Sequence, residues 1–409
     1  MRLVVRKYGG TSVGTPERIR TVARRVAAAH RNGEQLAIVV SAMGDSTDDL
    51  VVLAGEVSGS EAGRRHPREW DMLLSAGERI AMALVAMAIR DQGVEALSLT
   101  GSQAAIVTDG AHTAARITEI RAQRVREELQ KGRVVIVAGF QGVSPDGEVT
   151  TLGRGGSDTT AVALAAALGA DACEIYTDVD GIYTADPCRV PDARRIREIS
   201  HAEMVELATA GAQVMHPRAV EIGARYGVDI RVLSSLADTP EGTLITRTPR
   251  GMEELALSGI ASSRGQARLV VRDLPPDLAT SAELLSRLAS AAISVDTITE
   301  ALEATGRSQL QLTVAQEVLG EARRIAEQLA DELGGGSVET LEGLARIALV
   351  GSGMTGRPGV YAQTFRVLLE AGVSLHAVST SSISITVWVP ETSETVALEA
   401  LHRAFGLDR

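Results

Sequence analysis

Short runs of aliphatic and β-branched residues alternate with longer amphipathic stretches over the first 235 residues. This alternation is typical of a mostly parallel sheet sandwiched by helices. Between the first two expected strands, Thr15 can cap a helix that has Pro16 in its first turn and Gly33 past its end. We therefore predict one α/β domain over residues 1–235. Its expected strands are Leu3–Val5, Leu36–Val40, Arg133–Ala138, Cys173–Tyr176 and Ile230–Leu233.

The pattern changes after residue 235. Residues 236–254 are rich in turn formers and have no sustained periodicity, which predicts a linker. Residues 255–342 then follow the order strand, helix, strand, strand, helix, and the same order returns over residues 343–409. A repeated β-α-β-β-α unit of this size predicts two ferredoxin-like α+β domains. Their strands are expected at 268–271, 294–299 and 309–314, and again at 346–350, 373–379 and 383–389.

Composition narrows the class of protein. The 41 basic and 52 acidic residues give a net charge of -11, which argues against a nucleic-acid partner. The two cysteines, Cys173 and Cys188, have neither metal-like spacing nor a paired framework, as expected in a reducing compartment. No secretory signal opens the chain, and apolar runs such as Ala161–Ala170 fall short of the ~18 residues that suggest a membrane span. We expect a cytoplasmic protein without a membrane partner.

The first candidate site is the segment from Lys7 to Ser12, which reads Lys-Tyr-Gly-Gly-Thr-Ser and follows the first expected strand. Its two glycines allow backbone amides to approach an anion near a helix start. Lys7 could neutralise a phosphoryl group, while Thr11 and Ser12 offer donors to its oxygens. Taken alone, the segment is better explained as a plain Gly-Gly turn beside a surface lysine.

The second candidate, residues 151–160, is more specific. It is a glycine-rich loop that opens an alanine-rich helix. Gly155 and Gly156 permit close backbone approach, and Arg154 offers a planar fork for a carboxylate. Asp158 falls in the first helical turn, where a negative charge is favoured. A simple helix cap would not require an arginine between glycines.

A third candidate, residues 176–187, follows another buried strand and suits a nucleotide at the carboxyl edge of the sheet. A calcium loop is excluded, because Ile182 and Arg189 stand where acidic ligands should be. Asp178 and Asp180 are as readily turn residues as ligand contacts. Glu78, beside Arg79 in an amphipathic helix, would ordinarily belong to a solvated charge pair. The histidines do not form metal-ligand pairs, so no metal site of the protein's own is expected.

Five segments in this order resemble the aspartate kinases of the amino-acid kinase family, namely residues 7–13, 41–44, 75–79, 153–160 and 176–187. The repeated tail resembles that family's paired ACT domains, so the resemblance covers nearly the whole chain. It implies ATP-dependent phosphorylation of the β-carboxylate of L-aspartate to 4-phospho-L-aspartate. This reaction opens the aspartate-derived pathway to lysine, threonine and methionine.

The resemblance also implies roles for individual residues. Lys7 and Asp158 would be catalytic, with Asp158 organising Lys7. Arg154 would hold the α-carboxylate of aspartate and Glu78 its ammonium group. ATP would bring its own Mg²⁺. The other implied substrate-binding residues are Ser41, Thr47 and Ser157, and the implied nucleotide-binding residues are Lys7, Gly9, Gly10, Thr11, Ser12, Thr177, Asp178, Tyr183, Arg189 and Gln213.

Two positions depart from the family's pattern. Cys188 stands where an arginine usually follows the Asp-Pro of the nucleotide loop, and Arg189, one position later, could substitute for that arginine. Gln213 replaces the usual lysine or arginine before Val214, so weaker nucleotide affinity is expected. Two alternatives stay open at this point: a sibling kinase of another amino-acid carboxylate, and a catalytically weak amino-acid-sensing regulatory protein.

The tail carries two further expectations. ACT-like domains commonly pair, which predicts a homo-oligomer, a dimer or larger, with Met252 as an internal start for a separate regulatory subunit. Residues 273–277 read Asp-Leu-Pro-Pro-Asp where such units normally have an Asp-x-Pro-Gly turn. Two prolines remove amide donors, and Asp277 adds a negative charge where an effector's carboxylate would approach. We therefore expect feedback control by lysine or threonine to be weakened or altered.

Overall fold

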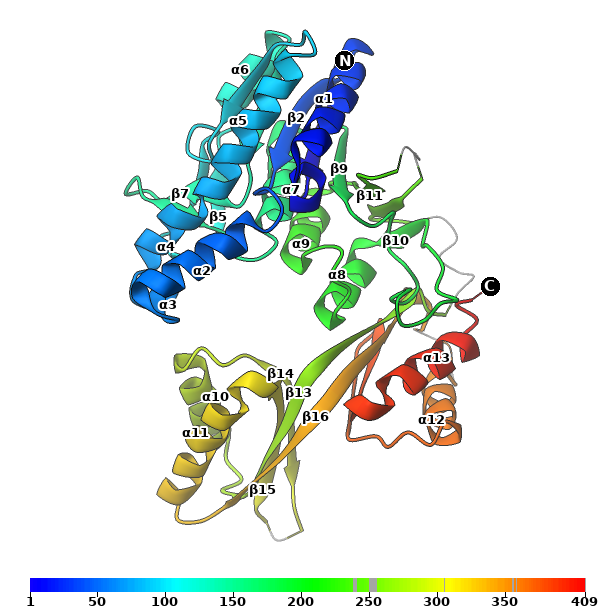
Figure 1. Ribbon diagram of the computed structural model, residues 1–409. Coiled ribbons are helices and arrows are strands. Elements are labelled where there is room, and N and C mark those ends of the chain that lie inside the picture. The colour runs from blue at the N-terminus through cyan, green and yellow to red at the C-terminus, as the bar shows by residue number, and fades with distance from the viewer. Residues whose placement is uncertain (238–240, 250–255, 305, 355–356, 358, 409) are drawn as a thin grey trace. The chain divides into compact units, whose positions relative to one another are not determined.

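The structure is a computed structural model that describes residues 1–237, 241–249, 256–304, 306–354, 357 and 359–408 (Figure 1). The chain forms two compact units. The first contains residues 1–183 and 195–252, and the second contains residues 184–194 and 253–409. Met252 lies outside the described residues.

The first unit is built on an eight-stranded, mostly parallel sheet. All five strands expected from the sequence lie in it, so that prediction is confirmed. The first strand is longer than predicted, because it runs on to Tyr8 and carries Lys7 on the strand itself. In order across the sheet, the strands are β10 (Glu198–Ser200), β12 (Thr243–Thr246), β11 (Ile230–Ser234), β9 (Ala172–Thr177), β1 (Leu3–Tyr8), β2 (Gln35–Val40), β6 (Val134–Ala138) and β3 (Ala96–Leu99).

Helices cover both faces of this sheet. On one face, α1 (Pro16–Arg31) and α5 (Ala76–Arg90) form a core with β1, β2 and β6. The cap of α1 is confirmed, because the Thr15 hydroxyl oxygen accepts a 3.3 Å hydrogen bond from the backbone of Arg18. On the other face, α7 (Gly156–Leu168) is buried along most of its length, which explains its apolar sequence. The remaining helices of this unit are η1 (Gly10–Val13), α2 (Ser46–Ser58), α3 (Ala62–Arg65), α4 (Pro67–Leu74), α6 (Gln123–Gln130), α8 (His201–Ala210) and α9 (Pro217–Tyr226).

The stretch Pro67–Arg90, which comprises α4 and α5, is long and apolar enough to cross a membrane, with a mean hydropathy of 1.7. Half of its most apolar window, 50%, is buried. Within α5, Ala81, Val85 and Ile89 pack into the core against the sheet. The stretch is therefore the core helix of a globular unit. The search for uninterrupted apolar runs in the sequence missed this stretch, because polar residues occur at intervals along it.

A small four-stranded sheet was not predicted. Its order is β5 (Ile117–Ile120), β4 (Ile106–Thr108), β7 (Gln141–Val143) and β8 (Val149–Thr151). These strands have only three or four residues each, too few for an alternating pattern to stand out. Their importance is positional, because β8 ends at Thr151, directly before the glycine-rich loop.

The second unit has one six-stranded sheet that serves both repeats. Strands β13 (Gly259–Leu274) and β16 (Ser337–Val350) pair antiparallel over most of their length, and each passes from one hydrophobic core to the other. The pairing shifts register near Gly265 and Gly343, which both have a φ of 71°. The other elements are β14 (Val295–Leu302), β15 (Ser308–Ala315), β17 (Ala377–Thr380), β18 (Ser384–Pro390), α10 (Leu278–Ser290), α11 (Leu319–Glu332), α12 (Val360–Glu370) and α13 (Glu394–Ala404).

The predicted fold class, a helix-sandwiched parallel sheet followed by ferredoxin-like α+β units, is confirmed. The repeat in the sequence did not reveal that both ferredoxin-like repeats contribute strands to one continuous sheet within the second unit. The predicted strands at 268–271 and 346–350 are only parts of β13 and β16. The domain limits at residues 235, 254 and 342 stay a prediction, and β16 runs through residue 342.

Residues 184–194, directly after the expected nucleotide loop, belong to the second unit. Ala185 and Val190 are buried in the core that lies beneath α12 and α13. Arg189 forms an ion pair with Glu394, whose side chain is completely buried, and Arg264 pairs with the other oxygen of that carboxylate. An excursion of the chain thus completes the second unit.

Candidate active site

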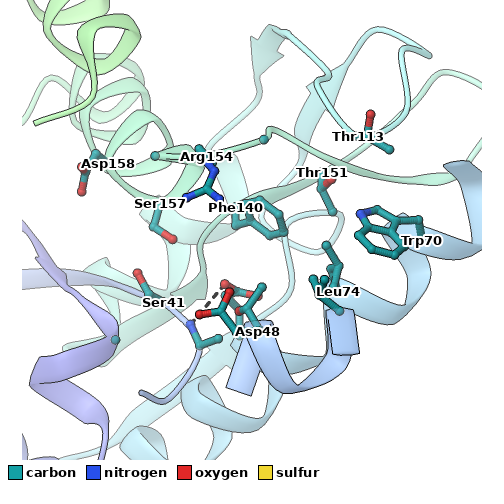
Figure 2. A pocket seen from close by; sticks show the side chains of 18 of the residues that line it. Ser41, Asp48, Trp70, Leu74, Thr113, Phe140, Thr151, Arg154, Ser157 and Asp158 are labelled. Atoms are coloured by element: carbon teal, nitrogen blue, oxygen red, sulfur yellow. Dashed lines mark hydrogen bonds between the residues drawn. The ribbon is translucent and has the colours of Figure 1, made fainter. Parts of the chain in front are cut away.

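A pocket of about 690 Å³ opens in the first unit near the carboxyl ends of β1 and β2 and the first turns of α2, α5 and α7 (Figure 2). It contains both predicted catalytic residues and all five predicted substrate-binding residues. The predicted residues that line it are Lys7, Gly10, Ser41, Thr47, Glu78, Arg154, Ser157 and Asp158.

Lys7 and Asp158 form a close ion pair in this pocket. The Lys7 Nζ atom lies 2.7 Å from the Asp158 Oδ1 atom, and their side chains are 12% and 11% exposed. Strand alternation turns Lys7 towards α7, whereas Tyr8 joins the core on the α1 face. The predicted organisation of Lys7 by Asp158 therefore has a direct geometric basis. Such a pair fixes the ammonium group while leaving its other protons for a ligand.

Glu78 is a buried carboxylate with one oxygen left over. The Ala42 backbone N–H donates a 3.1 Å hydrogen bond to Glu78 Oε1. Glu78 Oε2 is buried and has no hydrogen-bond partner among the described residues. Burial raises the pKa of Glu78 to about 7, against the opposing effect of the Ala42 bond. The expectation that Glu78 forms a solvated charge pair with Arg79 is therefore wrong. A cationic ligand in the pocket would stabilise the buried Oε2 atom.

Arg154 lies on a loop whose backbone requires glycine. Gly153 and Gly155 have φ values of 75° and 66°, in the left-handed region. A Cβ atom on Gly155 would also lie 2.3 Å from the Cβ atom of His216. Arg154 itself is exposed in the pocket and forms no ion pair with any other residue that the structure describes. Ser157 follows in the first turn of α7 and is buried.

Ser41, which directly follows β2, and Thr47, in the first turn of α2, also line the pocket. The Ser41 backbone N–H donates a 3.1 Å hydrogen bond to the carbonyl of Tyr8, which ties the end of β2 to the end of β1. Figure 2 places Ser41, Ser157 and Asp158 at one end of the pocket and Trp70, Thr113 and Thr151 at the other. The predicted substrate residues thus occupy one end and the middle of a larger chamber.

The glycine turn after β1 is locked to the end of β9. The Gly9 N–H donates a 3.2 Å hydrogen bond to the Tyr176 carbonyl, and the rings of Tyr8 and Tyr176 stack with centroids 4.8 Å apart. A Cβ atom on Gly10 would lie 3.0 Å from the Ala42 carbonyl oxygen, so only glycine fits without displacement. Ser12 is buried and Thr11 is exposed. This geometry brings the Lys7 segment and the start of the nucleotide loop together.

In the nucleotide loop, side chains bond mainly to one another. The Thr177 hydroxyl donates a 3.1 Å bond to Asp178, and the Tyr183 hydroxyl donates a 2.8 Å bond to Asp180. Arg195 holds the other oxygen of Asp180 at 3.2 Å. Asp180 is thus a structural residue of the loop, as its turn interpretation allowed.

The remaining two predicted nucleotide residues differ from the rest. Gln213 is exposed in the connection between α8 and α9. Arg189 lies in the second unit, where its guanidinium group is engaged by Glu394 and Ser262. The shifted arginine therefore serves the second unit's own packing in this structure, so the suggestion that it substitutes for Cys188 finds no support here.

Sequence reasoning missed several pocket-lining residues, including Trp70, Leu74, Thr113 and Phe140. Phe140 and Thr113 have φ values of 67° and 70°, which side-chain-bearing residues rarely adopt. Such strain clusters at functional sites, but it cannot be recognised in a sequence.

Comparisons with known proteins agree with this geometry. The model of the amino acid kinase family matches residues 2–234, and a model of the ACT domain matches residues 347–405. The class of protein that the fold and the pocket define is therefore an amino acid kinase joined to ACT domains.

Full-length relatives narrow that class. An aspartokinase of Mycolicibacterium smegmatis is 46% identical over 412 residues, which cover 100% of this chain and 97% of the relative. Aspartokinase 2 of Bacillus subtilis is 44% identical over 100% of this chain and 99% of its own length. The crystal structure of E. coli aspartokinase III in complex with aspartate and ADP matches with a TM-score of 0.82 at 28% identity, covering 98% of this chain and 99% of that one. The chain belongs to the amino acid kinase family and, within it, to the aspartokinases.

Proposed function

We propose that the protein transfers the γ-phosphoryl group of ATP to the β-carboxylate of L-aspartate, giving 4-phospho-L-aspartate and ADP. The observation that carries this proposal is the charge pattern of the pocket. One chamber contains a fixed lysine, together with an arginine that has no ion pair and a buried carboxylate oxygen that has no hydrogen-bond partner among the residues that the structure describes. This set is complementary to an amino acid whose side chain is itself an anion.

The two ends of the amino acid are recognised by opposite charges. The planar fork of Arg154 suits the α-carboxylate, which can accept two parallel hydrogen bonds. Glu78 Oε2 accepts from the ammonium group, and this contact returns the raised pKa of Glu78 towards its ordinary value. Ser41, Thr47 and Ser157 supply hydroxyl groups around the same ligand.

The reaction requires little proton chemistry, because the attacking β-carboxylate is already an anion at neutral pH. One of its oxygens bonds to the γ-phosphorus, and the bond from that phosphorus to the bridging oxygen of ADP breaks. The obstacle is the approach of two anions. Lys7, held by Asp158, supplies positive potential where they meet. Asp158 is therefore a positioning residue for Lys7.

On the nucleotide side, we propose that Gly9, Gly10, Thr11 and Ser12 face the phosphates, with Mg²⁺ arriving bound to ATP. Thr177, Asp178, Tyr183 and Gln213 would line the rest of the nucleotide site. E. coli aspartokinase III, with ADP and aspartate bound, supports ATP as the donor. The full-length aspartokinase relatives disfavour the sibling kinase and the silent sensor.

We further propose a cytoplasmic homo-oligomer that serves lysine and threonine supply, with weakened feedback by those amino acids. Asp277 directly precedes α10, and its carboxylate accepts a 2.8 Å hydrogen bond from the Thr280 backbone N–H. The side chain that departs from the family's turn thus caps the N-terminus of α10. Kinase assays with lysine, threonine and both together test the weakened feedback, and strong inhibition at submillimolar effector would refute it.

The function itself is tested by ADP release with aspartate, glutamate and N-acetylglutamate as acceptors. Hydroxylamine, which traps acyl phosphates, should yield aspartyl hydroxamate with aspartate alone. ADP release that depends on another acceptor would reassign the substrate, and none with any acceptor would refute the kinase.

A further inference from the structure

Asp71, on α4, is a carboxylate buried at the wall of the pocket. Its side chain is 0% exposed, and the pocket-lining residues do not include it. It accepts hydrogen bonds from three residues. The Thr113 backbone N–H approaches its two oxygens at 3.0 and 3.1 Å, the His112 Nδ1 atom lies 2.7 Å from Oδ2, and the Thr151 hydroxyl donates to Oδ1. A buried carboxylate needs this many donors to offset its lost hydration.

Two of these partners line the pocket. Thr113 and Thr151 lie beside Trp70 at the end of the chamber away from Asp158 (Figure 2). The loop that carries Thr113 is further tied to β8, because the Ala115 N–H donates a 2.9 Å bond to the Thr151 carbonyl. Asp71 therefore joins α4, this loop and β8 into one wall.

Thr113 is held in a conformation that it would not adopt unaided. Its φ of 70° lies in the left-handed region, where a β-branched side chain is strained. The bonds from its N–H to Asp71 offset that strain. Without them, we expect the loop to relax and the wall of the pocket to move.

Asp71 also orients a functional group. Because the Thr151 hydroxyl proton points to Asp71, the oxygen can offer only lone pairs to a ligand. Seven residues further along the chain, Glu78 also lines the pocket, and its Oε2 atom has no hydrogen-bond partner within the described part of the chain. Both groups are acceptors, and they suit an ammonium-bearing ligand.

From these contacts we infer that Asp71 is a positioning residue for the amino-acid substrate, acting through Thr113 and Thr151. The inference rests on the proposed function, because it takes the occupant of this pocket to be aspartate. Its predicted signature is selective: affinity for aspartate depends on Asp71, whereas affinity for ATP does not.

The test compares Asp71→Ala with the double variant Asp71→Ala/Thr113→Gly. The single variant should raise the aspartate KM at least tenfold and leave the ATP KM within twofold of wild type. Glycine adopts a φ of 70° without strain, so the double variant should have a several-fold lower aspartate KM than the single one. A merely structural role for Asp71 would not produce this rescue.

A matched control lies in the same loop. The half-buried Asp109 accepts 3.3 and 3.0 Å bonds from the backbone N–H groups of Ala111 and Arg116, and it is not one of the hydrogen-bond partners of Thr113 or Thr151. Asp109→Ala should keep both KM values within twofold of wild type. If Asp71→Ala does not fold, Thr151→Val removes one of the donors, and it should raise the aspartate KM selectively by a smaller factor.

The results separate the two claims. A wild-type protein without aspartate-dependent ADP release refutes the proposed function. An active wild type combined with an unchanged aspartate KM in folded Asp71→Ala overturns the positioning role. An equal rise in both KM values, or no rescue by Thr113→Gly, overturns it as well. In the fallback, an unchanged aspartate KM in Thr151→Val overturns it.

Discussion

The proposed amino-acid end of the pocket, which carries Glu78 and Arg154, and the proposed nucleotide loop, residues 176–187, satisfy their polar groups in opposite ways. At the amino-acid end, Glu78 Oε2 has no partner among the described residues, and Arg154 forms no ion pair with any of them. In the nucleotide loop, Asp180 takes bonds from both Tyr183 and Arg195. An end with unpaired charges recognises its ligand by charge, whereas a loop that is already bonded offers a fixed shape. The amino-acid end should therefore be more sensitive to single substitutions.

The largest effect is expected where the two regions meet. Lys7→Met should lower kcat at least ~10³-fold, because it removes the charge that offsets two approaching anions. The change also leaves Asp158 buried without its partner, so some loss of stability is expected. Lys7 is not the exposed loop residue that its sequence suggested. Steady-state kinetics with a thermal melt measure both effects, and the Lys7→Met/Asp158→Asn variant should recover stability without activity. Near-normal turnover by folded Lys7→Met would remove Lys7 from the mechanism.

Glu78→Gln should weaken aspartate binding by about 100-fold, since a buried charge opposite an ammonium group is lost. In wild type, the aspartate KM should rise as pH falls through about 7, because Glu78 becomes neutral there. The variant should lack that dependence. A pH series of aspartate KM decides the point, and a wild-type KM that is flat between pH 6 and 8 would contradict the assignment.

Glu78→Gln should also change the free energy of unfolding. A carboxyl group whose folded pKa is raised makes the native state less stable as pH rises from the unfolded value of 4.5 to about 7, and the cost is complete above that. Glu78→Gln should therefore be more stable than wild type at pH 8, by roughly 3 kcal/mol. Urea unfolding at pH 5 and pH 8 should show the gain growing with pH. The buried charge of Glu78 thus lowers the stability of the folded protein at high pH. We expect no such cost from Asp180 of the nucleotide loop, which is already paired.

Arg154→Lys should raise the aspartate KM by about tenfold, because a point charge replaces a bidentate fork. The ATP KM should change little. As a matched control, Arg121→Lys alters an exposed surface pair with Glu119 and should leave both constants unchanged. A change confined to the ATP KM would place Arg154 on the nucleotide instead.

The smallest effect is expected on the nucleotide side. Gln213→Lys restores a cation at an exposed position, and it should lower the ATP KM by a few-fold while aspartate affinity stays constant. The gain should shrink with added salt, since exposed charges are screened. An ATP KM that does not fall would separate Gln213 from the phosphates.

Local patterns predicted the segments that carry Lys7, Arg154 and Asp158, because one is a glycine turn after a strand and the other is a glycine-rich loop that opens a helix. Glu78 was recoverable only through resemblance, since its burial depends on packing that no local pattern records. Asp71 is a further example. In the sequence it is one acidic residue of an amphipathic helix, and its partners lie 41 to 80 positions away. The sequence did not predict the shared sheet of the second unit for the same reason, because β13 pairs with β16, a distant segment, across two cores.

The packing of residues 184–194 in the second unit has a consequence for a shorter product that starts at Met252. A second, shorter product translated from Met252 would lack Ala185 and Val190, two side chains of the core beneath α12 and α13. It would also lack Arg189, one of the two arginines that form ion pairs with the buried Glu394. Such a product would lack a segment that packs into this core in the full-length chain. Translation from an internal start would therefore create a subunit whose complement is built into the full-length chain.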